Sequence, residues 1–563
     1  MDKINKKLVK ILAGYQNYEW GKIGESSQVY QIAKCWNDNL QLNQAYAELW
    51  MGTHVNCPSI AIIENDQKIK LGELIATQPD FYLGKQVKEK YNLQDQLPFL
   101  FKILSVNKAL SIQAHPDIEL AKKLFKEFPN IYKDPNHKPE MCIALTEYEV
   151  LCNFCKADEI VENLNITPEL REVINNQELV DKFCSSKSKE DLKNIFTALF
   201  DASQDHITEQ VKKLINRVQQ KQVKNERDLL VIKLNEQYPN DVGVFVSYLL
   251  NYFKMKQGDC LIMAANEPHA YISGDCIECM VASDNVVRAG LTPKFKDKVT
   301  LCNMLTYEMK DPSILQQKVT FEDQNKGQII ELYSPEDFKE FSCLKISLKE
   351  GDLQKTIKLE SGSIFIVIQG QAAVFVDEAN TANILKGDTY FIPANVEFSF
   401  KNSQNLIKEE NNINNLNISR VVIAFVFLSF LAEIYKRKFS KNQQIQEKIN
   451  KQEKGLMEEE ISEVVQESSI HLSDEQKWCI AISSQYLIQL TLKSHGQKKV
   501  LYSNPAVFLQ VQLELYAFHS KIVQSKLIMS IKLHKSETIK KNIDRFMDYM
   551  FNNIIKSYYL QII

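Results

Sequence analysis

The stretch NEPHAYISGDCIECMVASDNVVRAGLTPKFKDK, residues 266–298, combines β-forming residues with a histidine, acidic residues and cations. A strand over His269–Ser273 would place His269, Tyr271 and Ser273 on one face, because strand side chains alternate. A second strand over Cys276–Val281 would place Glu278 among apolar neighbours. A carboxylate buried in such a place needs a partner, since an unpaired buried charge is costly.

Cations follow these two predicted strands. Arg288 and Lys294 lie on or beside the turn-rich segment AGLTPKFKD, residues 289–297. A histidine, a carboxylate and a cationic loop together suggest a metal-assisted site for an anionic substrate. A structural strand pair with a hydrogen-bonded core histidine explains this stretch equally well, so both interpretations stay open at this point.

A second stretch, ALSIQAH at residues 109–115, favours the metal site. As a strand it places Ser111, Gln113 and His115 on one face. Glu140 follows about 25 residues later, at the start of the apolar run MCIAL. Together with His269, these residues would offer a metal ion two imidazoles, one carboxylate and one amide oxygen (Gln113, His115, Glu140 and His269). Such a set suits zinc or a similar divalent ion, with room for substrate or water.

A lysine interrupts the apolar run PFLFKILSV, residues 98–106, which is predicted to be a buried strand. Lys102 is unusual there unless its ammonium reaches solvent or a ligand. A phosphate group would be a suitable ligand in a site that already carries Ser111 and Lys138. His54, by contrast, has no acidic neighbour in the sequence and is predicted to be structural.

Composition limits the class of protein. The chain has 563 residues, enough for several domains, and its 68 basic and 71 acidic residues give a net charge of −3, which does not suggest nucleic-acid binding. Its 12 cysteines and the absence of a secretory apolar segment suggest a reducing cytosol. The CxxC pairs Cys152/Cys155 and Cys276/Cys279 are too far apart for a zinc ribbon and are predicted to be buried structural thiols.

The period of the apolar residues changes along the chain. Residues 1–155 and 239–310 are predicted to be mainly strands and loops, with one helix that begins after its N-cap Asp117, whereas residues 156–238 show helical spacing and are predicted to be an all-helical insertion. Residues 311–430 alternate again, and Gly387-Asp388 with TYFIPANVEF repeats the spacing of Gly258-Asp259 with CLIMAANEPH. In this repeat Phe398 stands where His269 stands, so the second unit is predicted to be metal-free. Residues 431–563 are predicted to be a largely helical C-terminal extension of unknown role, and a membrane-inserted segment is not expected.

Five segments carry a resemblance to a known family: YEWGKIG, ELWMGTH, LPFLFKILSVNKALSIQAHPD, DPNHKPEM and the stretch at 266–298. Over roughly residues 5–425 the chain resembles type I phosphomannose isomerases, zinc enzymes of the cupin superfamily. The resemblance implies a mainly β fold with two cupin (jelly-roll) barrels and a helical domain. It also implies one Zn²⁺ per chain and a cytoplasmic enzyme that supplies mannose for glycan precursors such as GDP-mannose.

The implied reaction is the interconversion of mannose 6-phosphate and fructose 6-phosphate, in which a proton moves between C1 and C2. Arg288 would stabilise the enediolate charge, and Glu278, Lys138 and His137 are alternative proton carriers. Ser111, Lys102 and Lys294 are candidates for binding the phosphate. Trp20, Tyr271 and Asp284 match family positions near the site, although each could instead be a packing residue.

Three other hypotheses remain open. A metal-dependent cupin oxygenase would use similar ligands. A sugar-phosphate-binding protein without catalytic activity would keep the same pocket. The extension could also mediate self-association, which is compatible with enzyme activity.

Overall fold

The computed structural model describes residues 4–310, 319–323, 328–335, 339–349, 356–377, 380–402 and 420–427. All of these residues belong to the first of two units, Met1–Lys436. The predicted C-terminal extension, with its predicted helical character, lies outside them. Within the described part of the chain, no helix is both long enough and apolar enough to cross a bilayer.

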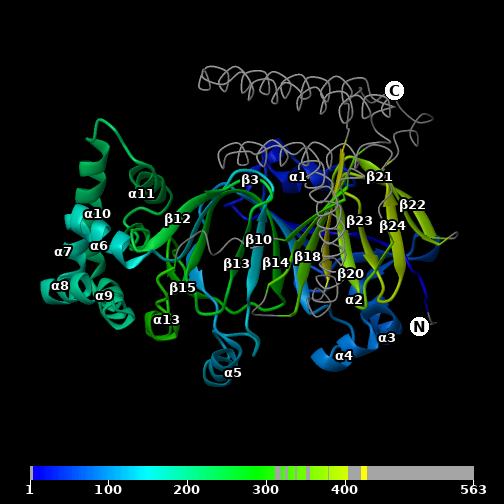
Figure 1. Ribbon diagram of the computed structural model, residues 1–563, viewed down its shortest axis with the longest axis horizontal. Coiled ribbons are helices and arrows are strands. Elements are labelled where there is room, and N and C mark those ends of the chain that lie inside the picture. Colours follow the sequence, from blue (N-terminus) through cyan, green and yellow to red (C-terminus); the bar gives the residue numbers. More distant parts are fainter. Residues whose placement is uncertain are drawn as a thin grey trace, which may run out of the picture. The chain divides into compact units, whose positions relative to one another are not determined.

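A ten-stranded sheet is built around β8 (Phe99–Val106) and β14 (His269–Val281), which pair antiparallel along their length. All eight residues of β8 are buried, as the apolar run around Lys102 predicts. We call this sheet and its loops the first β-region (Figure 1). Its other strands are β2 (Gly14–Gln16), β5 (Glu48–Met51), β9 (Ile112–Ala114), β10 (Glu140–Ala144), β11 (Tyr148–Phe154), β12 (Leu250–Met255), β13 (Cys260–Met263) and β15 (Val287–Gly290).

β14 is one continuous strand where the sequence predicted two. His269 and Glu278 are an odd number of residues apart, so a regular strand would direct them to opposite faces. The register with β11 shifts by one residue between Ser273 and Tyr271, and Gly274 has φ +116°. Tyr271 and Cys276 consequently pack in the same core cluster although one position is odd and the other even. This β-bulge is the reason that both halves of the strand can direct side chains to one face.

The second β-region contains a nine-stranded and a four-stranded sheet. Six strands of the nine-stranded sheet come from the later part of the chain: β16 (Val319–Asp323), β17 (Gln328–Tyr333), β18 (Ser342–Lys349), β20 (Ser363–Gln369), β23 (Thr389–Ile392) and β25 (Arg420–Phe427). The four-stranded sheet contains β19 (Ile357–Lys358), β21 (Gln371–Asp377), β22 (Asn380–Leu385) and β24 (Glu397–Lys401).

Strands from the N-terminus complete the nine-stranded sheet. β1 (Val9–Leu12) pairs with β23 on one side and with β6 (Ile60–Ile62) on the other, and β7 (Lys68–Lys70) forms the edge. The predicted first domain included these strands. Their pairing shows that the two β-regions share the N-terminal segment, so no single residue divides them.

The predicted internal repeat has the same backbone form in both regions. Gly258 and Gly387 have φ +86° and +91°, and Asn266 and Asn395, eight residues further on, both have φ +62°. In each copy a short strand, β13 or β23, lies between the two turns. Phe398, which stands where His269 stands, is buried and packs edge-on against Phe400.

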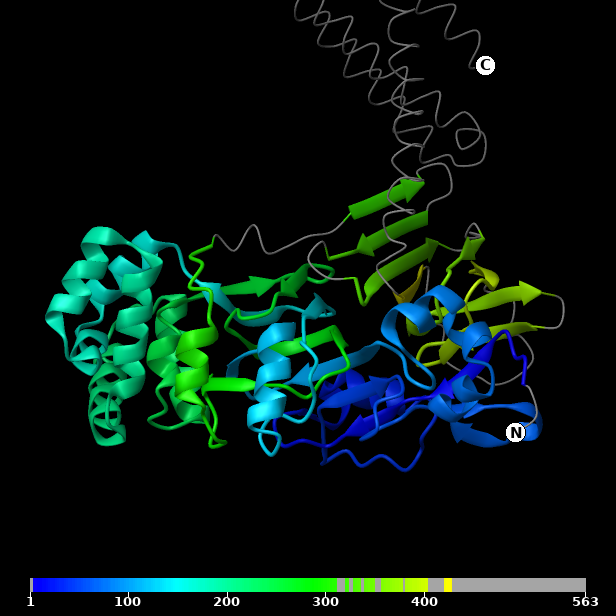
Figure 2. The same cartoon turned by 90° about the horizontal axis from the view of Figure 1, so that it is seen from below.

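The predicted helical insertion is observed and lies at one end of the described unit, beside β12 and β15 (Figures 1 and 2). Ser188, Ser203 and Asn225 each cap a helix by accepting a hydrogen bond from a backbone N–H of its first turn. Apolar residues of the insertion join those of α12 and β14 in one core. The helices of this region are α6 (Ala157–Ile166), α7 (Pro168–Ile174), α8 (Gln177–Ser186), α9 (Lys189–Asp201), α10 (Gln204–Gln219), α11 (Glu226–Gln237) and α12 (Gly243–Val246).

The other described α-helices are α1 (Gln28–Ala33), α2 (Leu71–Thr77), α3 (Pro79–Leu83), α4 (Lys85–Tyr91), α5 (Ile118–Glu127) and α13 (Lys298–Met304). Asp117 caps α5 by accepting a hydrogen bond from the Leu120 N–H. β3 (Lys22–Ile23) and β4 (Ala45–Tyr46) form a separate pair.

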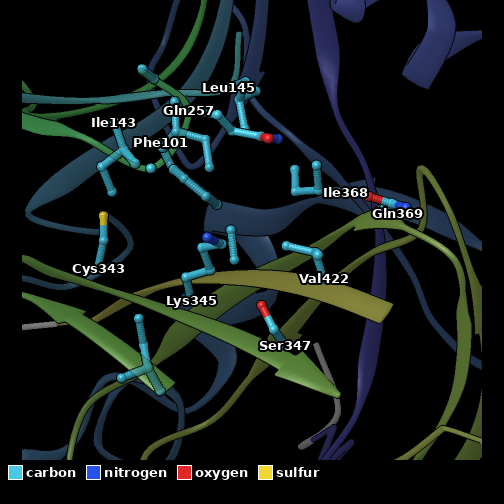
Figure 3. A pocket seen from close by; sticks show the side chains of 15 residues that line it. Phe101, Ile143, Leu145, Gln257, Cys343, Lys345, Ser347, Ile368, Gln369 and Val422 are labelled. Atoms are coloured by element: carbon cyan, nitrogen blue, oxygen red, sulfur yellow. The ribbon is translucent and has the colours of Figure 1, made fainter. Parts of the chain in front are cut away.

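The two β-regions pack against each other through a shared apolar core, and this core opens into a cavity of about 140 Å³. Figure 3 shows Phe101 and Ile143 of the first region on one side and Lys345, Ser347 and Val422 of the second on the other. None of the predicted site residues lines this cavity. The cavity is therefore separate from the candidate site.

Candidate metal centre and active site

Three predicted metal ligands meet at one buried point. His115 follows β9, Glu140 begins β10 and His269 begins β14. One ligand atom from each lies within 4.8 Å of the others, and all three residues are buried. His115 Nε2 lies 3.4 Å from Glu140 Oε1, and His269 Nε2 lies 3.4 Å from Glu140 Oε2. The topology thus brings together residues that are up to 154 positions apart because β14 pairs with both β9 and β10.

The donor atoms of this cluster fit a zinc ion. His115 Nε2, His269 Nε2 and Glu140 Oε2 are fully buried, and each lacks a hydrogen-bond partner within the described part of the chain. Leaving three buried polar atoms unsatisfied is costly. The ligand atoms of the three residues lie within 4.8 Å of one another, close enough for one ion to be bound by all three. The cluster therefore has the chemistry and spacing of a metal site.

A hydrogen-bonded shell orients His115. Its Nδ1 lies 2.7 Å from the Asn285 carbonyl oxygen, which fixes Nε2 toward the cluster. The buried Asn285 amide donates in turn to the carbonyl oxygens of Asp134 (2.7 Å) and Asn136 (2.9 Å). On the other ligand, His269 Nδ1 lies 3.2 Å from the Glu267 carbonyl oxygen. Each imidazole thus has a backbone carbonyl oxygen at Nδ1, as metal-binding histidines commonly do, and this leaves Nε2 for an ion.

Electrostatics at the cluster favour a neutral His115 beside a charged Glu140 carboxylate. Burial lowers the pKa of His115 to about 4. Burial alone would raise the pKa of Glu140, but the Lys138 ammonium, 2.9 Å from Glu140 Oε1, and His115 hold it well below its usual range. These are the protonation states that a divalent cation requires of its ligands.

Gln113 lies beside the cluster, in register with His269 on one strand and Arg288 on another. Its side-chain oxygen accepts a hydrogen bond of 3.2 Å from the Ser111 hydroxyl. The partly buried Arg288 guanidinium has no hydrogen bond or ion pair to any described residue, and burial lowers its pKa. The strand order therefore places an uncompensated cation next to the predicted amide ligand.

Lys102 and Glu278 face each other across β8 and β14, with Nζ 3.2 Å from Glu278 Oε2. Glu48 of β5 lies on the other side of the same ammonium, at 3.4 Å, and accepts a hydrogen bond of 2.5 Å from Trp50 Nε1. Burial raises the pKa of Glu278, and Lys102 opposes this increase. Glu278 is thus a buried carboxylate with a raised pKa, as a general base requires.

The remaining predicted residues lie in different settings. Tyr271 is buried in the core of the first β-region, with its hydroxyl 3.6 Å from Met263 Sδ. The partly buried Trp20 ring stacks on Tyr18 with centroids 5.9 Å apart. Lys294 is exposed, and its ammonium contacts no other predicted site residue. His137 does not contact the metal cluster; its Nε2 lies 3.0 Å from Glu340 Oε1, a residue of the second β-region.

Several residues near the site were missed by the sequence analysis. Glu48 alternates with Trp50 in a buried strand, so the reasoning that singled out Lys102 could have found it. His54 has an acidic partner after all: its Nε2 lies 3.5 Å from Asp284 Oδ1, and this contact lowers the pKa of Asp284. No sequence signal links His54 to Asp284, because 230 residues separate them.

The predicted structural role of the CxxC cysteines agrees with the structure. Cys152, Cys155, Cys276 and Cys279 are all buried free thiols. Among the described residues, the only group of histidine, cysteine or acidic side chains close enough to hold a metal ion is the His115–Glu140–His269 cluster. This cluster contains no cysteine.

Comparison with known proteins places this geometry in a family. Residues 8–157 match the model of the phosphomannose isomerase type I catalytic domain, and residues 166–250 match that of its helical insertion domain. Mannose-6-phosphate isomerase of Candida albicans is 40% identical over 417 residues, which cover 69% of this chain and 93% of that protein. Mannose-6-phosphate isomerase 1 of Arabidopsis thaliana is 39% identical, covering 71% and 93%.

Solved structures give the same result. A variant of Salmonella typhimurium phosphomannose isomerase matches with a TM-score of 0.63 and 26% identity over 75% of this chain and all of that one. A zinc-bound mannose 6-phosphate isomerase matches with a TM-score of 0.62 and 26% identity, over 75% and 99%. Sequence and structure together show that the chain belongs to the type I phosphomannose isomerase family.

Proposed function

We propose that this chain interconverts mannose 6-phosphate and fructose 6-phosphate with one zinc ion per chain. The observation that carries the proposal is the buried His115–Glu140–His269 cluster, whose unsatisfied donor atoms lie beside the buried Lys102–Glu278 pair. The names of the relatives, which are mannose-6-phosphate isomerases, support the same reaction.

In this proposal Gln113 joins His115, Glu140 and His269 as the fourth metal ligand. When bound there, zinc supplies a Lewis acid for the substrate oxygens. Ser111 donates to the Gln113 amide oxygen and so orients it. Lys138 lies on the Glu140 oxygen that also faces His115, where it keeps that carboxylate ionised.

Glu278 is the proton carrier we favour. Its carboxylate is buried, has a raised pKa and is held by Lys102. Lys138 is engaged with Glu140, and His137 with Glu340, so both are less free to accept a substrate proton. Glu278 would take the proton from one of the two carbons and return it to the other.

Arg288 would stabilise the negative charge of the enediolate, contributing about 3–4 kcal/mol by analogy with an oxyanion-hole donor. Its guanidinium has no acidic partner among the described residues, so its charge is available to the substrate. We assign the phosphate to Lys294 and to Ser111, whose single hydroxyl hydrogen would turn from the Gln113 oxygen to the phosphate when substrate binds. Lys102 is already compensated by two carboxylates and therefore supports Glu278. Trp20 and Asp284 would border the substrate, and Tyr271 would support it from the core.

We infer the division into barrels and domains from the resemblance to the family. We propose two cupin barrels, a catalytic one over residues 1–155 and 239–310 and a metal-free one over 311–430, with the helical domain at 156–238. The free thiols of the described cysteines fit a reducing compartment, and we propose a cytosolic location with a role in mannose supply. Self-association through residues 431–563 remains compatible with this activity.

The test is isomerisation of mannose 6-phosphate to fructose 6-phosphate by the full-length chain. Activity should be lost on chelation, return with zinc, and fall at least about 100-fold in Arg288→Ala and His269→Ala. Arg171→Ala, in the helical insertion, is the matched control and should keep full activity. Turnover without oxygen would exclude the oxygenase alternative. Folded, zinc-loaded protein that binds the sugar phosphate without converting it would replace this proposal with the binding-protein alternative.

A further inference from the structure

One contact crosses from the second β-region to the loop that carries Lys138. His137 Nε2 lies 3.0 Å from Glu340 Oε1, and the two side chains are only 24% and 18% exposed. Burial alone would raise the pKa of Glu340, but the contact with His137 helps to hold that pKa below its ordinary value. The contact therefore offsets part of the cost of burying the carboxylate. A shielded pair of this kind holds its geometry better than a surface ion pair does.

Glu340 is itself held in place. Its Oε2 accepts a hydrogen bond of 2.9 Å from the Lys339 backbone N–H, and the Lys339 carbonyl oxygen accepts one of 3.2 Å from the Tyr91 hydroxyl. The next residue, Phe341, is fully buried in the core shared by the two β-regions, immediately before β18. The carboxylate is therefore a fixed point, because the backbone on its C-terminal side is anchored in a core.

The other end of the loop is anchored within the first β-region. Asp134 accepts hydrogen bonds from the Ser283 hydroxyl (2.9 Å), the Asp284 N–H (2.9 Å) and the Asn285 amide (2.7 Å). Asn136 is held by the same segment. Beyond Asn136, the side-chain contact that fixes the loop before Lys138 is the one between His137 and Glu340.

We propose that Glu340 is a positioning residue for the active site. By binding His137 it fixes the C-terminal end of the Asp134–His137 loop and so holds Lys138 against Glu140. The second β-region would thereby contribute to catalysis, although its described residues add no ligand to the candidate metal cluster. This inference rests on the proposed isomerase function.

The activity test compares Glu340→Ala with Glu340→Gln and His137→Ala. Glu340→Ala should lower kcat roughly 10-fold, the size of effect that outer-shell partners have, while KM changes little. Glu340→Gln keeps an oxygen acceptor for His137 Nε2–H and should restore most of the activity. The Glu340→Ala, His137→Ala double variant should be no slower than either single variant, because both remove the same contact.

Asp388→Asn is the matched control. Asp388 also belongs to the second β-region and pairs with Lys10 of an N-terminal strand at 2.8 Å, with 16% of its side chain exposed. Its loss should leave kcat unchanged while costing a similar amount of stability. A purely structural role for Glu340 would make the two variants behave alike.

Hydrogen exchange gives a readout that does not depend on activity. Glu340→Ala should speed exchange at residues 136–138 relative to wild type, and Asp388→Asn should not. The inference would be overturned if hydrogen exchange at residues 136–138 were the same in Glu340→Ala as in wild type. It would also be overturned if wild type were active and Glu340→Ala had the same kcat. An inactive wild type with faster loop exchange in Glu340→Ala would instead refute the isomerase function and keep the loop contact.

Discussion

At the scale of single residues, opposing electrostatic effects decide the state of the Lys102–Glu278–Glu48 group. Burial alone would lower the pKa of Lys102, yet the two carboxylates outweigh it and raise that pKa. For Glu278 the balance is reversed, because burial raises its pKa more than Lys102 lowers it. One ammonium shared by two carboxylates therefore leaves Glu278 easier to protonate than an ordinary glutamate.

This balance predicts a pH effect of Lys102→Gln. In the proposed mechanism Glu278 must be ionised to accept a proton, so activity should fall as the pH drops through its pKa. Removing the Lys102 charge removes a group that lowers this pKa, so the acid limb of the kcat profile should move to higher pH. Lys345→Gln, which removes the partner of Glu331 in the second β-region, is the control and should leave the profile in place. An acid limb that stays fixed or moves down in Lys102→Gln would argue against Glu278 as the base.

At the scale of elements, β14 organises the site because one bulge changes which residues face the cluster. The strand supplies His269 from its first half and Glu278 from its second half, and these residues would face opposite ways without the bulge. Gly274 makes this possible: a Cβ there would lie 2.4 Å from the Glu147 carbonyl oxygen, and its φ is +116°.

Gly274→Ala should therefore destabilise the fold and weaken the site together. We expect a loss of at least about 1–3 kcal/mol in the free energy of unfolding, measured in urea, from backbone strain and the clash with Glu147. Zinc affinity should fall as well, because His269 is moved. Gly258→Ala is the comparison: its φ is +86°, but the nearest atom to its Cβ is 3.6 Å away, so it should cost less and spare zinc. Equal costs for the two variants would contradict the role assigned to the bulge.

At the scale of the whole molecule, every predicted site residue lies in the unit Met1–Lys436. The same unit contains both β-regions, joined by the N-terminal strands β1, β6 and β7 and by a common core. The relatives support this division, since a match over 69% of this chain covers 93% of the Candida albicans protein. The catalytic unit thus accounts for nearly the full length of a relative.

Removal of residues 437–563 should accordingly leave kcat/KM for mannose 6-phosphate unchanged within error. The measurement is steady-state kinetics of the truncated and full-length chains, with mass determined by light scattering in parallel. A smaller assembly with unchanged kinetics would assign self-association to the extension. Loss of activity in a folded, zinc-loaded truncation would show that the extension takes part in the reaction.

Local patterns in the sequence predict many of the strands, the helical insertion and the residue types of the metal cluster. The apolar run around Lys102 predicts β8, helical spacing predicts the insertion, and the polar residues His115, Glu140 and His269 predict a metal site. These signals are local, since they depend on side-chain period and on the cost of burying charge. The tertiary structure alone decided the bulge that aligns His269 with Glu278, the pairing of His54 with Asp284 and the contact of His137 with Glu340. Each of these depends on which strands pair and in what register, and no local pattern specifies contacts between residues hundreds of positions apart.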